Sequence, residues 1–415
     1  MYKIGIVGLG YVGLPLLKFF SKKFNTIGYD INPNRISELK EGQDSTRELA
    51  AEDLENLIFS NSLAGLKECN VFIITVPTPI LEDKSPDLKP LKSSSLMIGS
   101  ILKKNDLVIY ESTVYPKCTE EVCIPILEKE SGLVLNEDFY VGYSPERVVP
   151  GDKTRTIDKI MKIVSGSSLE ALEIVDHLYS QIIKAGTYRA ASIPVAEAAK
   201  AIENAQRDLN ISFVNELAII FSKIGIDTTE VIEAASTKWN FHSYKPGLVG
   251  GHCIGVDPYY LVHKSREVGY IPEVILSGRN LNESVSDHIV KSVTDKLAEQ
   301  NAQIIVKNLS CLVLGITFKE NCPDVRNTGV YNLVQSLKKS GIRTEIYDPV
   351  ASKNKVLEEY NLTLKEPREK SYDIVILAVG HDCFKTLNPN EYTKSNGLVY
   401  DIKSFYPREN NYIRL

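Results

Sequence analysis

The chain has 415 residues, and its 43% hydrophobic and 24% charged content is that of a globular protein with more than one domain. The formal net charge of −5 excludes a generally basic surface for nucleic acid, although a local basic pocket would suit an anionic small substrate. Apolar runs are too short for a membrane span, and an expected strand at the start of the chain argues against a signal peptide. Seven cysteines without framework spacing fit reduced thiols in a cytoplasm.

The first part of the chain, residues 1–192, alternates short apolar runs with amphipathic stretches. Continuous apolar runs separated by helical patterns predict a parallel sheet covered on both faces, as in a Rossmann-like domain. The expected strands are Ile4–Val7, Thr26–Tyr29, Val71–Val76, Leu107–Tyr110 and Tyr140–Tyr143.

A glycine-rich turn follows the first expected strand. Gly8, Gly10 and Gly13 have the GxGxxG spacing that permits a tight turn, close approach of a pyrophosphate, and close helix packing. Asp30 ends the next strand, where an acid binds ribose hydroxyls and repels a 2′-phosphate. The turn therefore predicts NAD rather than NADP, although Arg35 nearby would suit a 2′-phosphate. The expected contacts in the turn are Gly8, Gly10, Tyr11, Val12 and Gly13.

Two later segments lie where strands are expected to end. Thr78 follows the run that ends at Val76, and Thr113 follows the run that ends at Tyr110. Ligands bind at the carboxyl ends of parallel strands, so these hydroxyls are candidates for the cofactor or a catalytic water. Strand-end capping is the alternative explanation.

The second part, residues 193–306, is predicted to be helical and begins with one long helix. From Pro194 to about Ile224 apolar residues recur at three- and four-residue steps, and Gly225 ends the pattern. A helix of about 30 residues spans roughly 45 Å, which is long enough to join two domains and carry a homodimer face; a core helix is the alternative. Lys200, Asn204 and Asp208 share one face of it, as a site or as a solvated row.

The same part contains Cys253 among several glycines, with Asp257 four residues later. Glycines allow close backbone approach to a ligand, and a thiol near positive charge becomes a nucleophile. Cys253 is therefore the candidate nucleophile, and Asp257 a candidate base acting through water. Five other cysteines are expected to be small buried hydrophobes, namely Cys118, Cys123, Cys311, Cys322 and Cys383. No cluster of soft ligands predicts a metal.

The third part, residues 307–415, starts with a second strand that runs into a glycine, Gly315. Further expected strands are Arg343–Tyr347, Tyr372–Val379 and Leu398–Ile402. This alternation again predicts a parallel sheet. The predicted fold is thus α/β, with two Rossmann-like, doubly wound domains joined by a long helix and a small helical domain.

Six motifs in order resemble the UDP-glucose/GDP-mannose dehydrogenase family. They are KIGIVGLGYVGLP, ESTVYP, SPERVVPG, EAAKAIENAQRDLNISFVNE, GGHCIGVDPYYL and GITFKENCPDVRNT. The resemblance implies oxidation of a sugar C6 alcohol to a carboxylate with two NAD, by way of a thiohemiacetal and a thioester on Cys253. It implies that Lys200 and Asn204 stabilise the C6 oxygen, that Asp257 holds the active water, and that Glu146, helped by Thr113, assists thioester hydrolysis.

The resemblance also extends to the ligands. It implies that Arg326 helps to bind the cofactor or the neighbouring domain and that the third part binds the UDP-sugar. The substrate contacts expected from it are Glu146, Arg147, Lys200, Asn204, Tyr244, Gly250, Arg279 and Lys319. Arg279 is expected to reach the substrate across a dimer, or else to be an ordinary helix-surface arginine.

The residues around the cysteine indicate a branch of the family. The UDP-glucose branch usually has serine before the cysteine and Phe-Pro-Lys-Asp after it, whereas this chain has His252 before and Ile254-Gly255-Val256-Asp257 after. The chain thus resembles the branch that acts on UDP-N-acetylhexosamines for bacterial surface polysaccharides. UDP-N-acetylglucosamine or its C4 epimer is the preferred substrate. UDP-N-acetylmannosamine, UDP-glucose, a simple two-electron dehydrogenase and a non-catalytic NAD-binding regulator are the alternatives.

Overall fold

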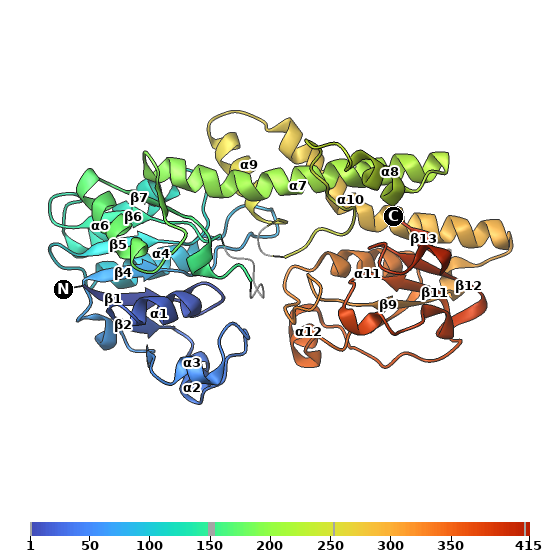
Figure 1. Cartoon of the computed structure of the whole chain (residues 1–415), viewed down its shortest axis with the longest axis horizontal. Coiled ribbons are helices and arrows are strands. Elements are labelled where there is room, and N and C mark those ends of the chain that lie inside the picture. Colours follow the sequence, from blue (N-terminus) through green and yellow to red (C-terminus); the bar gives the residue numbers. More distant parts are fainter. Residues whose placement is uncertain (1, 148–153, 252–253, 411) are drawn as a thin grey trace. The chain divides into compact units, whose positions relative to one another are not determined.

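The computed structural model describes residues 2–147, 154–251, 254–410 and 412–415. It contains two compact units. The first unit comprises Met1–Glu203 and Tyr259–Tyr270, and the second comprises Asn204–Pro258 and Ile271–Leu415. Each unit contains one sheet with its own hydrophobic core (Figure 1).

The sheet of the first unit has the strand order β3-β2-β1-β4-β5-β6-β7-β8. All neighbouring strands run parallel except β6 and β7, which pair antiparallel. The order reverses beside β1, which is where a doubly wound sheet binds its ligand. The strands are β1 (Lys3–Val7), β2 (Asn25–Tyr29), β3 (Ile58–Ser60), β4 (Val71–Ile74), β5 (Leu107–Tyr110), β6 (Tyr140–Tyr143), β7 (Lys162–Gly166) and β8 (Thr187–Arg189).

Helices connect these strands and bury the apolar faces of the sheet. Helix α1 begins at Gly13 and packs Leu14, Leu17 and Phe20 into the core around Ile4 and Ile6. The helices are α1 (Gly13–Ser21), α2 (Pro33–Lys40), α3 (Ala51–Leu54), α4 (Lys89–Gly99), α5 (Ile124–Ser131) and α6 (Leu169–Ser180).

Four further helices form the middle of the chain (Figure 1). The longest, α7, runs from Ile193 to Ile224 and ends at Gly225, whose φ of +75° is the left-handed conformation typical of a helix C-terminus. The predicted helix from Pro194 to about Ile224 is therefore confirmed. The others are α8 (Thr228–Ala235), α9 (Asp257–Glu267) and α10 (Glu273–Gln300).

The sheet of the second unit is fully parallel, in the order β10-β9-β11-β12-β13. Helix α11 presents Val330, Leu333 and Leu337 to a core that also contains Val285 and Ile289 of α10. The elements are β9 (Ser310–Leu314), α11 (Gly329–Lys339), β10 (Arg343–Tyr347), α12 (Lys353–Tyr360), β11 (Tyr372–Leu377), β12 (Thr393–Asp401) and β13 (Ile413–Arg414).

Two parallel sheets with a Rossmann-like order confirm the predicted fold class. One detail was wrong: Cys383 is exposed rather than buried, because Phe384 takes the inward position in its short turn. The other four cysteines expected to be buried are buried. Within the described residues, no helix is long and apolar enough to cross a membrane.

Candidate active site

The glycine turn has the geometry that its sequence predicts. Gly8 has a φ of +96°, a conformation that side chains rarely adopt. A Cβ on Gly13 would lie 1.9 Å from the carbonyl oxygen of Gly8, so α1 can start this close to β1 only with glycine there. Beside Gly10, a Cβ would meet nothing within 4 Å. The backbone of the turn is therefore open at Gly10, as a bound pyrophosphate requires.

Asp30 at the end of β2 is held against this turn. Its carboxylate accepts hydrogen bonds from Leu9 N at 2.9 Å and from Asn32 N at 2.9 Å. The guanidinium of Arg35 donates to Leu9 O at 3.0 Å and lies 2.7 Å from Asp44. Arg35 is buried in these contacts and supports the backbone of the turn at Leu9. Its predicted part in cofactor binding stays a prediction. Gly10, Gly13 and Asp30 together fit NAD.

Hydrogen bonds join the strand-end segments that contain Thr78 and Thr113. The Thr78 hydroxyl donates to Thr113 O at 2.6 Å, and Ser112 donates to Val76 O at 2.6 Å. The Tyr260 hydroxyl donates to Thr78 O. Thr78 thus caps the neighbouring segment, and the ends of β4 and β5 form one hydrogen-bonded rim.

The polar row on α7 is buried, so the solvated alternative is wrong. Lys200, Asn204 and Asp208 have relative exposures of 7%, 5% and 0%. The Asn204 amide donates to Asp257 at 2.5 Å, where α9 begins, and so joins two of the predicted catalytic residues. Asp208 instead pairs with Arg279 at 2.6 Å. Cys253 lies outside the described residues.

The segment before the cysteine packs against the start of α11. Gly251 N donates to Asn327 O at 2.8 Å, and a Cβ on Gly250 would lie 2.6 Å from Gly329 N. Gly250 therefore has a packing reason to lack a side chain. Further back, Asn215 of α7 clamps Gly247 by donating to its carbonyl at 3.1 Å and accepting from its N–H at 2.8 Å.

The remaining predicted contacts lie in varied surroundings. Arg147 pairs with Glu203 at 2.8 Å and donates to Met161 O at 2.9 Å. Arg326 makes two contacts with Asp324, the shorter at 2.7 Å. Tyr244, Glu146 and Lys319 are partly exposed. Arg279 is 4% exposed, so it is not an ordinary surface arginine; its contact across a dimer stays a prediction.

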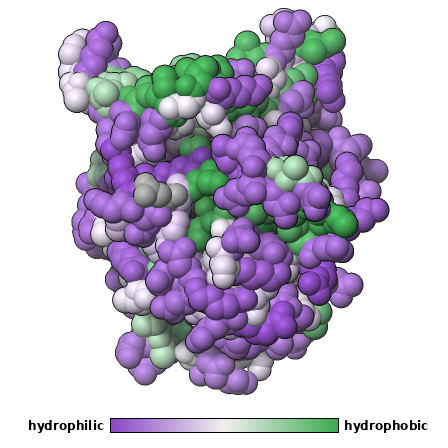
Figure 2. Space-filling view, turned by 90° about the vertical axis from the view of Figure 1, so that its right-hand side faces the viewer, coloured by the Kyte–Doolittle hydropathy of each residue, from purple (hydrophilic) through white to green (hydrophobic). Residues whose placement is uncertain are grey.

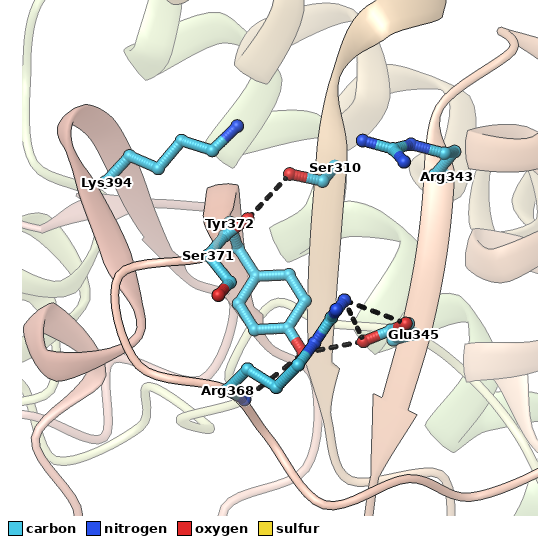
Figure 3. A pocket seen from close by; sticks show the side chains of 7 residues that line it. All are labelled: Ser310, Arg343, Glu345, Arg368, Ser371, Tyr372 and Lys394. Atoms are coloured by element: carbon cyan, nitrogen blue, oxygen red, sulfur yellow. Dashed lines mark hydrogen bonds and ion pairs between the residues drawn. The ribbon is translucent and has the colours of Figure 1, made fainter.

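A hollow of about 300 Å³ lies at the edge of the C-terminal sheet where its strands begin (Figure 3). There Arg368 makes two contacts of 3.1 Å with Glu345, which also accepts a 2.7 Å hydrogen bond from Tyr372. Lys394 pairs with Asp373 at 2.8 Å. Ligands of such sheets bind at the carboxyl edge, and most of these cations are already paired, so this hollow is not the candidate site.

Two charged residues that the sequence reasoning did not assign lie under the predicted catalytic segments. Glu111 belongs to the ESTVYP motif, and Lys162 lies on β7; both are buried and paired at 2.6 Å. The available signal was weak: Lys162 directly precedes the two apolar residues Ile163 and Val164. Among the described residues, no group of three or more histidine, cysteine or acidic side chains is placed to hold a metal.

A doubly wound sheet with this glycine turn and Asp30 defines an NAD-binding Rossmann-like protein. Three matches to family domains then give its family. Residues 2–183 match the NAD binding domain of the UDP-glucose/GDP-mannose dehydrogenase family, residues 194–284 its central domain, and residues 312–408 its UDP binding domain. The chain belongs to this family of NAD-dependent nucleotide-sugar dehydrogenases.

Proteins of known name resemble this chain over its whole length. The chain is 51% identical to the UDP-N-acetyl-D-glucosamine 6-dehydrogenase of Pseudomonas aeruginosa, covering 100% of this chain and 99% of the other. It is 50% identical to the protein of that name from Salmonella typhi, covering 100% and 98%. The structure of UDP-D-ManNAc dehydrogenase from Pyrococcus horikoshii matches with a TM-score of 0.88 at 28% identity, covering 98% and 96%.

Proposed function

We propose that this protein oxidises the C6 alcohol of UDP-N-acetylglucosamine to the carboxylate, using two NAD. The observation that carries the proposal is the roughly half identity, over the full length, to two proteins named for this activity. The open glycine turn with Asp30 and the buried pair of Asn204 and Asp257 support it. UDP-N-acetylgalactosamine is the second candidate, because it differs only at C4.

The proposed chemistry uses Cys253 as the nucleophile that keeps the aldehyde bound between the two oxidations. NAD, when bound, accepts a hydride in each oxidation. Lys200, with its ammonium in a buried position on α7, and Asn204 stabilise the charge that develops on the C6 oxygen. Asp257 orients the Asn204 amide and holds the water, and Glu146 with Thr113 serves the hydrolysis of the thioester.

The substrate is tested with a panel of UDP-N-acetylglucosamine, UDP-N-acetylgalactosamine, UDP-N-acetylmannosamine and UDP-glucose, with each product identified by mass spectrometry. We expect the uronic acid from UDP-N-acetylglucosamine to form fastest, and from Cys253→Ala none at all. Acid formed at the wild-type rate by Cys253→Ala would remove the covalent route. Oxidation of UDP-glucose faster than of UDP-N-acetylglucosamine would contradict the proposed substrate.

We further propose a homodimer that forms through α7. Val195, Ile202, Phe213, Ile220 and Ile224 lie 7, 11, 7 and 4 residues apart, each spacing close to a whole number of turns at about 3.6 residues per turn. They form one stripe, and their exposures of 46–61% are high for apolar side chains. Figure 2 shows hydrophobic residues gathered along the upper edge of the face that it draws.

Light scattering after gel filtration tests this face. Phe213→Asp places a charge in the stripe and is expected to give monomers. Ser222→Asp is the control and is expected to leave the dimer intact, because Ser222 is exposed and lies nine residues, about two and a half turns, from Phe213 on the opposite face of the helix. A Phe213→Asp protein that stays dimeric would contradict the α7 interface. The division into residues 1–192, 193–306 and 307–415 and the cytoplasmic location stay predictions.

A further inference from the structure

One buried ion pair connects the two strand ends that contain Thr113 and Glu146. Lys162 Nζ of β7 lies 2.6 Å from the Glu111 carboxylate at the end of β5, and these side chains are 4% and 0% exposed. Lys162 Nζ also donates to Pro145 O at 3.0 Å. Because Pro145 directly precedes Glu146, the ammonium holds the backbone from which the Glu146 side chain extends.

The Glu111 side of the pair is held just as firmly. The Tyr179 hydroxyl of α6 donates to the other carboxylate oxygen, and the Lys162 ammonium lies 5.3 Å from the centre of the Tyr179 ring. The backbone of Glu111 donates to Ile74 O at 2.9 Å. Two residues beyond Glu111 lies Thr113, so the pair sets the positions of both proposed hydrolytic residues.

The carboxyl groups of Glu111 and Glu146 also affect each other electrostatically. Burial raises the pKa of Glu111, the Lys162 ammonium and the Tyr179 hydroxyl oppose this rise, and the negative charge of Glu146 adds to it. The Glu146 carboxylate is therefore close enough to sense the charge of the pair. A change in the charge of the pair would therefore act on the Glu146 carboxylate as well as on the backbone that holds it.

We infer that Lys162 and Glu111 are positioning residues for the hydrolysis of the thioester, acting through Glu146 and Thr113. This inference rests on the proposed function. In the step concerned, the oxygen of water bonds to the acyl carbon while one water proton passes to the Glu146 carboxylate. The carbon–sulfur bond then breaks, and the sulfur of Cys253 leaves as a thiolate. The two hydride transfers do not use Glu146 as a proton acceptor, so the pair is expected to affect the last step most strongly.

The test compares Lys162→Met with the double variant Glu111→Gln/Lys162→Met. The single change leaves a buried carboxylate without its cation, so it lowers stability as well as hydrolysis. The double change removes both charges and is expected to recover thermal stability, but Pro145 O still lacks its donor. The matched control is Lys184→Met, which removes an ion pair of 2.8 Å to Asp158 from a lysine that is 84% exposed.

The reaction is stopped in acid during turnover, and the acyl-enzyme is measured as an added mass on the intact protein. For the double variant we expect a burst of NADH, accumulation of the acyl-enzyme and hydrolysis about 100-fold slower than in the wild type, the cost typical of misplaced reacting groups. Lys184→Met is expected to behave as the wild type does.

The contradicting results are distinct. A double variant that recovers stability and also hydrolyses at the wild-type rate would show that the pair is only structural, and would overturn this inference. An equal loss in every step without acyl-enzyme would overturn it too. If the wild type itself forms no acid from any UDP-sugar, the proposed function fails, and the inference fails with it.

Discussion

The two Rossmann-like sheets begin with the same backbone turn. In the first sheet, Gly8 follows β1 with a φ of +96°, and its N–H donates to Tyr29 O at 2.8 Å. In the second, Gly315 follows β9 with a φ of +88°, and its N–H donates to Tyr347 O at 2.8 Å. An aspartate comes directly after each tyrosine, Asp30 in one sheet and Asp348 in the other.

The sheets differ in what surrounds this shared turn. Asp30 stays partly exposed at the open glycine turn. Asp348 is sealed: it accepts from Ile316 N and Thr317 N at 2.7 and 3.2 Å and lies 3.2 Å from the ring of His381, which is fully buried. The second and third glycines of the first turn have no glycine at the same spacing after Gly315.

This comparison shows that the fold alone does not make a dinucleotide site. The first sheet leaves its turn and its acid open to a ligand, and it is the NAD binding domain of the family. In the second sheet the corresponding acid, Asp348, binds the sheet's own loop instead, and this sheet lies in the UDP binding domain.

Replacing Asp348 is expected to destabilise the unit that contains the second sheet. Asp348→Ala leaves four backbone N–H groups and His381 without their acceptor, and we expect it to lower the free energy of unfolding by about 4 kcal/mol. Chemical denaturation followed by circular dichroism measures this loss. A loss below about 1 kcal/mol, which is typical of exposed ion pairs, would contradict the sealed role of Asp348.

The two later glycines of the first turn are expected to separate folding from ligand binding. Gly13→Ala forces a Cβ against Gly8 O and should cost about 3 kcal/mol of stability, an overpacking penalty. Gly10→Ala meets no atom within 4 Å and should leave stability unchanged, but its methyl group occupies the space for the pyrophosphate. Calorimetric titration with NAD should show weak binding for both; normal binding by Gly10→Ala would place NAD elsewhere.

Buried acids in the two units are expected to respond to pH in opposite ways. Burial raises the pKa of Glu197 from 4.5 to about 7, although it accepts hydrogen bonds from Lys117 N and Thr119 N. Hydrogen bonds and the charge of His381 overcome burial and lower the pKa of Asp348. The folded state therefore holds the Glu197 proton to higher pH than the unfolded chain does.

It follows that Glu197 favours folding most below about pH 4.5, and that this contribution is lost as the pH rises to about 7. The wild type is expected to lose on the order of 2–3 kcal/mol of unfolding free energy over this pH range because of Glu197, whereas the Glu197→Gln variant should not show this loss. The difference in unfolding free energy between the two proteins is measured from pH 4.5 to 8. A difference that does not change with pH would show that Glu197 titrates normally.

The smallest effect is expected at Asp30. Asp30→Ala should change stability by only about 1 kcal/mol, because its acceptor role at Leu9 N is partly exposed to water. It should also reduce the preference for NAD over NADP, measured as the ratio of kcat/KM values. An unchanged ratio would show that Asp30 does not read the ribose.

Sequence patterns predicted most of this architecture, because strands such as β4 and β5 are continuous apolar runs and α7 repeats apolar residues over 32 residues. They missed β3, β8 and β13, which have only two or three residues each. They also missed β7, which begins with a buried lysine and ends in serine and glycine. Side-chain partners could not be predicted, because periodicity within one element contains no information on contacts between elements. The contact of Arg279 with Asp208, for example, joins residues that are 71 positions apart.

The central claim is a four-electron oxidation by an NAD domain working with a UDP-sugar domain. It is tested most directly by the number of NADH formed, by absorbance, for each molecule of UDP-N-acetylglucosamine consumed by the purified protein. We expect two NADH for each sugar, with the acid as the product. One NADH for each sugar with an aldehyde product, or none despite measurable NAD binding, would contradict it.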